Sequence, residues 1–133
     1  MRKVLILSFL MVFFLNCSSS DGEMQAEQEE MEEVEVILGD FVSGAHTTTG
    51  KADVSPDLKT LNFTNFKTDN GPKLLVYLTT AVGSSDFVSL GDLKGVSGNY
   101  SYSIPANTDL TKYKIVDIWC VDFSVSFGHA ELK

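Results

Sequence analysis

Turn-forming residues divide residues 36–133 into short segments, and their spacing limits the fold more than any other feature of the chain. They recur roughly every 8–12 positions, a spacing typical of an antiparallel β-sandwich or barrel. The positions are Gly44, Gly50, Ser55-Pro56, Gly71-Pro72, Gly83, Gly95, Gly98 and Pro105. No internal repeat interrupts the series. We therefore expect residues 36–133 to form one small domain with a single core.

The segments between these turns have the composition of strands. The segment "KTLNFTNFK" alternates apolar Leu61 and Phe63 with polar Asn62 and Thr64, and "KLLVYLTT" is an apolar run suited to a central strand. The segments "VEVILGDFV", "DFVSLGDL" and "NYSYSI" are similar. The pattern predicts an all-β fold, a single antiparallel β-sandwich or barrel-like domain of about seven to nine short strands.

Two local signals refine this prediction. Asn70-Gly71, in "TDNGP", is a strong tight-turn signal, so the segments on either side of it are expected to pair as a hairpin. The segment "NTDLTKY" has a helical pattern about one turn long, with Asn107 or Thr108 as its N-cap. We therefore expect at most one short helical turn.

The N-terminus has the pattern of an export signal. Arg2 and Lys3 precede an apolar run over residues 4–15, which is shorter than the ~20 residues that a membrane-spanning helix needs. The run ends in "LNCSSS", which resembles a bacterial lipoprotein signal. We therefore predict a lipoprotein signal peptide over residues 1–16 and lipidation of Cys17, whose acyl chains would anchor the protein stably. The alternative is an ordinary secretory signal with a chance cysteine.

Residues 17–35 follow as a spacer. Beyond Cys17 this segment is rich in acidic residues and has no basic ones, so we expect a disordered, extended tether; an acidic binding tail or export signal is the alternative. The net charge of −8 belongs mainly to this segment, because acids and lysines nearly balance in residues 36–133. The domain has no arginine and no basic stripe, which argues against a nucleic-acid partner. The predicted location is the bacterial cell envelope, lipid-anchored to a membrane with the domain facing the periplasm or exterior.

The closing stretch "VDIWCVDFSVSFGHAEL" contains the only cysteine outside the N-terminus, Cys120. Odd positions from 119 to 127 are apolar, which predicts a core face, while Asp122, Ser124 and Ser126 face water. Val116 and Ile118 break this alternation, so a bulge lies near residues 118–119 or both faces are covered there. Cys120 lies where the apolar alternation changes from one face of the strand to the other. The pattern therefore predicts that its side chain is not in phase with the residues that face the core.

Several motifs in this order resemble the DM-thirteen domain, also called the electron-transfer DM domain, as in Skeletor-type proteins. They are "GDFVSGAHTTTG", "LNFTNFKTDNGPKLLVYL", "LGDLKG", "YSIP" and "IWCVDFSVSFGHAEL". The resemblance implies a small all-β module with proposed redox chemistry at one cysteine, which acts as a free thiol or holds a prosthetic group. It assigns this role to Cys120 and a second motif position to His46. It also matches structural positions at Gly50, Gly71, Pro72, Trp119, Phe123, Phe127 and Gly128.

The residues leave two interpretations of Cys120 open. If Cys17 is lipidated, Cys120 has no partner for a disulfide in this chain, which is unusual outside the cytoplasm. It is then a redox thiol or a cofactor ligand, with His46 as its partner and His129 as a tentative further ligand. Alternatively it is a small buried hydrophobe. A reactive thiolate needs a nearby cation, and His46, His129 or a lysine could supply one.

Cofactor and enzyme motifs are sparse. One thiol and two histidines do not fill a tetrahedral metal site, so no metal is predicted. Cys-x-x-Cys-His is absent, which excludes covalent c-type haem, while non-covalent haem and no cofactor both remain open. Motifs of classical enzymes are also absent. The sequence thus predicts either a lipid-anchored redox module with a redox partner protein, or a non-catalytic protein- or glycan-binding β domain with a structural cysteine.

Overall fold

A computed structural model describes residues 35–133. Residues 1–34 lie outside the described part, and with them the predicted signal peptide, the lipidation site Cys17 and nearly all of the acidic tether. Contacts along the chain group Glu35–Lys133 as one compact unit.

Residues 35–133 form eight strands, which agrees with the predicted number, and every strand pair is antiparallel. The strands are β1 (Leu38–Ser43), β2 (Thr49–Val54), β3 (Thr60–Lys67), β4 (Leu74–Thr79), β5 (Phe87–Asp92), β6 (Ser97–Ser103), β7 (Ile115–Cys120) and β8 (Val125–Glu131). No helix is found within this part of the chain. It follows that these residues include no helix long and apolar enough to cross a membrane.

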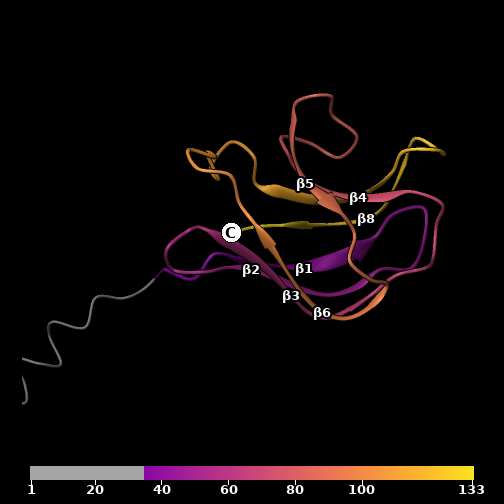
Figure 1. Cartoon of the computed structure of the whole chain (residues 1–133), viewed down its shortest axis with the longest axis horizontal. Coiled ribbons are helices and arrows are strands. Elements are labelled where there is room, and N and C mark those ends of the chain that lie inside the picture. Colours follow the sequence, from indigo (N-terminus) through magenta and orange to yellow (C-terminus); the bar gives the residue numbers. More distant parts are fainter. Residues whose placement is uncertain (1–34) are drawn as a thin grey trace, which may run out of the picture. The chain divides into compact units, whose positions relative to one another are not determined.

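The strands form one sheet that curls around a common interior, in the order β5-β4-β7-β8-β1-β2-β3-β6 (Figure 1). Strand β1 joins the two halves of the sheet, because Leu38 to Asp40 pair with β2 whereas Phe41 to Ser43 pair with β8. The edge strands β5 and β6 are bridged by residues 93–96. Leu93 N donates to Leu74 O at 2.9 Å, and Val96 O accepts from Thr68 N at 2.9 Å. The sheet is therefore a nearly closed barrel.

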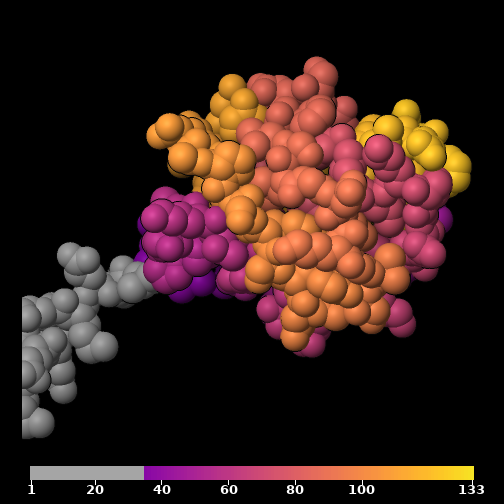
Figure 2. Space-filling model, in the orientation of Figure 1, coloured from indigo at the N-terminus to yellow at the C-terminus, as the bar shows by residue number. Residues whose placement is uncertain are grey.

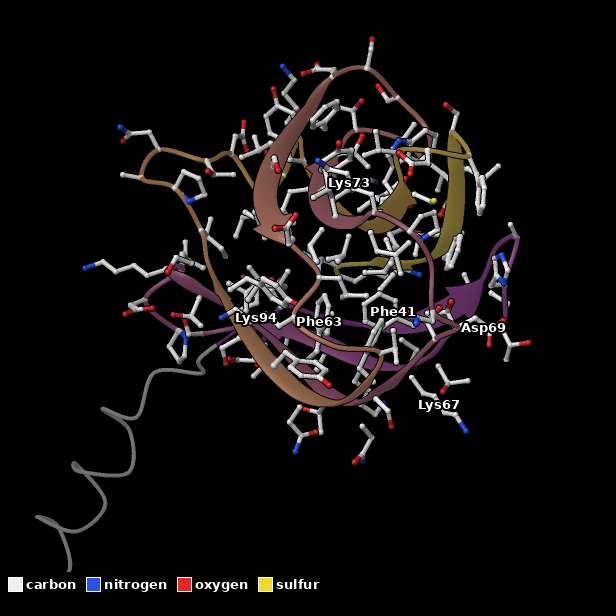
Figure 3. The ribbon with its side chains drawn as sticks, turned by 45° about the vertical axis from the view of Figure 1, so that its right-hand side comes forward. Phe41, Phe63, Lys67, Asp69, Lys73 and Lys94 are labelled. Carbon is white, nitrogen blue, oxygen red and sulfur yellow. The ribbon has the colours of Figure 1, made fainter. Side chains whose placement is uncertain are left out.

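Aromatic side chains fill the middle of this barrel. Phe41 and Phe63 point into the interior, whereas Lys67, Asp69, Lys73 and Lys94 lie at its periphery (Figure 3). The rings of Phe41 and Phe63 meet edge to face with centroids 5.0 Å apart, and Phe66 packs against both at the same separation. Aromatic rings at this separation attract one another, and this attraction stabilises the core in addition to the stabilisation from burying their apolar surface.

Strand β3 follows its predicted alternation and then changes register. Leu61 and Phe63 are buried, while Thr64 is exposed. A bulge follows between Phe63 and Phe66, where Asn65 adopts a φ of 50°. The backbone N–H of Asn65 donates to Asn99 Oδ1 at 2.7 Å. The extra residue turns Phe66 inward as well, so that both phenylalanines reach the core.

The predicted hairpin at Asn70-Gly71 is wrong. Strand β3 pairs with β2 and β6, and β4 pairs with β5 and β7. A two-residue turn requires the flanking strands to follow it directly, but residues 68–73 here form a longer connection that crosses from one half of the sheet to the other. The Asn70 side chain accepts a bond from Gly71 N at 3.1 Å, so the pair makes a local bend.

Two smaller expectations also change. Strand β2 lies where Gly50 suggested a turn, because Gly50 takes a φ of 118° within a bulge between Thr49 and Lys51. The segment "NTDLTKY", which the sequence pattern predicted to be helical, forms only a turn and no helix. Its cap is Asp109, whose carboxylate accepts from Thr111 N at 2.9 Å, rather than Asn107 or Thr108.

The antiparallel registers gather four connections at one end of the barrel, which we call the Cys120 end: residues 44–48, 68–73, 93–96 and 121–124. The described chain begins at the opposite end, because Leu38 N and O pair with Lys133 O and N. The β7–β8 turn, yellow in Figure 2, stands clear of the residues with which the domain begins.

Candidate functional site

Cys120 is fully buried in the core of the barrel, with none of its surface exposed. It is the last residue of β7 and points inward together with Ile118 and Val116, two and four positions earlier. It lies opposite Leu74 on β4 and opposite Val125 on β8. The prediction that Cys120 is out of phase with the core is therefore wrong.

The error arose because the closing stretch is a hairpin and not one continuous strand. Strand β7 ends at Cys120, residues 121–124 form a turn, and β8 begins at Val125. Val121 and Phe123, which the alternation placed in the core, are 38% and 60% exposed in that turn. Ser124 takes a φ of 55°, which reverses the chain. Alternation extrapolated through a turn assigns faces wrongly, since the period of two holds only within a strand.

The bulge that the sequence placed near residues 118–119 is confirmed. Ile118 lies opposite Gly128 and Trp119 lies opposite Ser126, which leaves Phe127 as an extra residue on β8. Phe127 and Gly128 are both buried as a result. Such a bulge turns the extra side chain out of the regular alternation, and here it brings the Phe127 ring into the Cys120 end.

His46 covers the Phe127 ring from outside. Its backbone N–H donates to Phe127 O at 3.2 Å, and the two rings lie 3.9 Å apart at 31°. His46 Nδ1 donates to Asp69 Oδ2 at 2.9 Å. The side chain remains partly exposed. His46 is therefore fixed at the Cys120 end by three contacts, and its immediate neighbours are Phe127 and Asp69.

Gly71 completes this packing because no side chain fits at its position. A Cβ there would lie 2.9 Å from the Phe127 ring and 3.1 Å from a Leu74 methyl group. Leu74 in turn is opposite Cys120. His46 contacts Phe127 and Asp69, whereas Cys120 lies across from Leu74 and Val125. The structure places the two predicted partners at the same end of the barrel but gives them different neighbours.

A surface hollow of about 520 Å³ opens beside Leu74. Its wall comes from the connections 68–73 and 93–96: Asn70, Gly71, Pro72, Lys73, Leu74, Asp92, Leu93, Gly95 and Val96 line it. Leu74 therefore faces the hollow while occupying the position across from Cys120. Leu74 is therefore the residue that the hollow and the pairing position of Cys120 have in common.

His129, the third predicted residue, lies on the outer face of β8. It is opposite Val42 on β1 and opposite Asp117 on β7. Its Nδ1 is buried and has no hydrogen-bond partner among the described residues. His129 is thus part of a different cluster from Cys120 and His46, and its central member is Asp117.

Asp117 is a candidate that the sequence interpretation missed. Its neighbours Val116 and Ile118 point inward, so Asp117 lies on the outer face, yet only 1% of its surface is exposed. It accepts hydrogen bonds from Ser126 Oγ and, at 3.2 Å, from Gly83 N in the β4–β5 loop. The one available signal was an acid within the apolar run "VDIW", which alternation treated as a face change.

Burial sets the protonation behaviour of this cluster. Loss of hydration raises the pKa of Asp117, although the bonds from Ser126 and Gly83 and the nearby His129 partly oppose this effect. Tyr77 lies opposite Asp117 on β4, and burial together with the Asp117 charge raises the pKa of its hydroxyl. Perturbed groups of this kind mark candidate functional sites, and structural clusters also produce them.

The residues around Cys120 do not fit a haem ligated through this sulfur. An axial ligand needs an open side on which the macrocycle can lie. Cys120 instead belongs to a continuous core cluster with Leu74, Val76, Ile118 and Phe127. Between Glu35 and Lys133, no three His, Cys, Asp or Glu side chains are grouped as metal ligands would be.

Comparison with known proteins gives one match. A sequence model of the family described as "Electron transfer DM13" matches residues 40–132, which is most of the described domain. No curated protein and no solved structure matches the chain. The match includes Cys120, His46 and the β7–β8 hairpin.

Proposed function

Because the chain belongs to the Electron transfer DM13 family, we propose that its β domain is the redox module of a lipid-anchored bacterial envelope protein and that Cys120 is its redox-active group. The observation that carries the proposal is the position of Cys120. It is the free cysteine of the described domain, at the end of β7 and directly across from Leu74, which also lines an open hollow.

The lipid anchor rests on the N-terminal sequence. A short apolar run after Arg2 and Lys3, followed by Cys17 and an acidic spacer, is the arrangement of a lipoprotein. The described chain enters the domain at the end opposite Cys120. A tether attached there leaves the Cys120 end free to meet a soluble redox partner. The protein then belongs to the cell envelope, with its domain facing the periplasm or exterior.

The chemistry that fits a single thiol is exchange with a disulfide of a partner protein. The Cys120 thiolate attacks one partner sulfur, a new disulfide joins the two proteins, and the other partner sulfur leaves as a thiolate that takes up the released proton. Cys120 must first be uncovered, since a thiol inside a packed core does not react. Displacement of Leu74 into the neighbouring hollow provides the shortest route.

The test is thiol accessibility in the folded protein, with a Cys17→Ser variant so that Cys120 is the only thiol. Reaction with a small aromatic disulfide is followed in buffer and in urea, alongside the unfolding rate. We expect Cys120 to react in the folded protein faster than global unfolding allows, and to form a mixed disulfide. Reaction only at the rate of global unfolding would show that the thiol is structural.

The second candidate is a non-catalytic protein- or glycan-binding domain, and the complete burial of Cys120 favours it. In that case Cys120 acts as a small apolar residue of the core. A Cys120→Ala variant would then keep every biological role of the protein and lose only stability. A redox module would lose its redox response in the same variant.

A further inference from the structure

The strongest feature outside the Cys120 end is a buried acid on a surface that should face water. Asp117 lies on the outer face of β7, and the β4–β5 loop, residues 80–86, covers it. Gly83 in this loop donates its amide to Asp117 and lies against Trp119, where a Cβ would meet the indole at 3.6 Å. The loop thus closes over Asp117 and Trp119 together.

The contacts that close the loop converge on one carboxylate. Gly83 N and Ser126 Oγ donate to its two oxygens, and His129 lies directly across the β7–β8 pair with its Nδ1 buried and without a partner within residues 35–133. A buried carboxylate is stable when it is protonated or when a nearby cation compensates its charge. A proton on either Asp117 or His129 satisfies that requirement.

We propose that the Asp117–His129 pair is a proton-operated latch for the β4–β5 loop. The closed loop retains one proton on the pair. When the pair loses this proton, an uncompensated carboxylate remains under the loop, and the loop opens so that water can hydrate it. Opening exposes more of Trp119, which is partly buried in the closed state and is the residue next to Cys120 in the chain.

The other titratable and charged groups around Asp117 and His129 are compatible with a proton held by this pair. Tyr77 from β4 is the other titratable group that faces Asp117. Asp86, the acid within the loop, is turned away to Tyr113 and Lys112. On the far side of His129, the hollow between β1 and β8 is lined by three charged residues, Asp40, Glu131 and Lys133. Asp40 is paired with Lys51 and Glu131 with Lys114.

The sign of the pH dependence follows from the number of bound protons. The closed state binds one proton more than the open state, so raising the pH favours opening. Protection of the Gly83 amide, corrected for the intrinsic pH dependence of exchange, should fall by about tenfold for each pH unit across the transition. Stability of the loop is then highest on the acid side of the transition and lowest above it.

The experiment follows two signals from pH 4 to pH 8 in the purified protein: hydrogen exchange at Gly83 and acrylamide quenching of Trp119, the only tryptophan. In the wild type both signals should report opening as the pH rises. Asp117→Asn keeps the loop closed across the range, because its amide is neutral. His129→Gln shifts the opening to a lower pH than in the wild type, because Asp117 alone must then hold the proton.

Asp122→Asn is the matched control, since it neutralises an exposed acid in the β7–β8 turn of the same hairpin. It should reproduce the wild-type profile. The proposal is overturned if the wild-type signals do not change with pH, or if Asp117→Asn retains the wild-type transition. If Asp117→Asn does not fold, the wild-type profile and its shift in His129→Gln decide the question.

Discussion

Leu74 lies directly across from Cys120 on the adjacent strands β4 and β7, and both side chains are buried in the barrel. Residues paired in this way have Cβ atoms about 5 Å apart, so the leucine packs beside the sulfur. Leu74 also lines the hollow formed by the connections 68–73 and 93–96. We therefore expect this side chain to influence the access of solvent or a partner to the thiol.

Leu74→Ala should make Cys120 reactive in the folded protein. The substitution truncates a side chain that lies across from Cys120 and lines the hollow, and it should lower the free energy of unfolding by about 2–5 kcal/mol, as for other buried leucines. We expect the rate of thiol modification under native conditions to rise by more than the loss of stability explains. The measurement is that rate beside a urea unfolding curve.

Leu78→Ala is the matched control for this prediction. Leu78 is also buried on β4 but lies opposite Val116, at the other end of β7. It should destabilise the domain to a similar degree without a specific increase in thiol reactivity. Equal reactivity in the two variants would mean that Cys120 is reached through general unfolding and not past Leu74.

Gly128→Ala should strain the bulge that holds Phe127. A Cβ at this position would lie 2.3 to 2.7 Å from the side-chain atoms of Thr48. Thr48 cannot retreat freely, because its hydroxyl donates to Phe127 O at 2.9 Å and contacts the Thr68 hydroxyl at 2.9 Å. We expect a loss of about 1–3 kcal/mol in the free energy of unfolding, measured by urea denaturation.

A double variant checks the cause of that loss. If the clash is with Thr48, adding Thr48→Gly, which removes the nearest atom Cβ, to Gly128→Ala should cost less than the sum of the two single substitutions. Residues in contact typically show coupling energies of about 0.5–3 kcal/mol. Additive effects would contradict the assignment of the strain to this contact.

Asp69→Asn should show whether His46 contributes to Cys120 chemistry or only to the stability of the domain. The His46–Asp69 pair is partly exposed, so its loss should change the free energy of unfolding by less than about 1 kcal/mol. If His46 assists Cys120 chemistry, the same variant should change the pH profile of thiol exchange. The control is Asp40→Asn, which removes a similarly exposed pair with Lys51 far from Cys120 in the register of β1. A pH profile identical in the two variants would assign His46 a packing role alone.

The sequence predicted the fold class well because its signals are local. Alternation of Leu61 and Phe63 with polar neighbours, and turn residues at regular spacing, depend only on the strand and the turn themselves. The pairing of strands is not local. Asn70-Gly71 had the chemistry of a hairpin turn, but β4 pairs with β7, which lies far along the chain, and no pattern around residue 70 encodes that choice.

The site was harder to predict for the same reason. The bulge near residues 118–119 was visible as a break in alternation, and it is present. The turn at residues 121–124 was not visible, because Val121 and Phe123 continue the apolar pattern across it. Asp117 escaped because its burial depends on Gly83, whose loop is distant in sequence. Contacts made across the fold decided each of these outcomes.

Tyr113→Phe should reduce the acid sensitivity of the domain. The Tyr113 hydroxyl donates to Asp86 Oδ1 at 2.8 Å, and this bond is the main cause that lowers the pKa of Asp86 below its ordinary 3.8, followed by Lys112. A carboxylate whose pKa is lowered in the folded state stabilises the fold above its unfolded pKa. That stability is lost as the pH falls through the folded value. The wild type should therefore lose stability on acidification, from about pH 5 downward, more steeply than Tyr113→Phe.

Urea midpoints from about pH 7 to pH 2 measure this difference. Tyr100→Phe is the control, because its hydroxyl donates to the carbonyl of Ser97 at 2.7 Å and that acceptor does not titrate. It should lower stability by the same amount at every pH. On the acid side, where Asp86 becomes protonated, the loss of stability relative to the wild type should shrink for Tyr113→Phe and stay constant for Tyr100→Phe. Parallel curves for the wild type and Tyr113→Phe over the whole range would mean that this bond does not set the ionisation of Asp86.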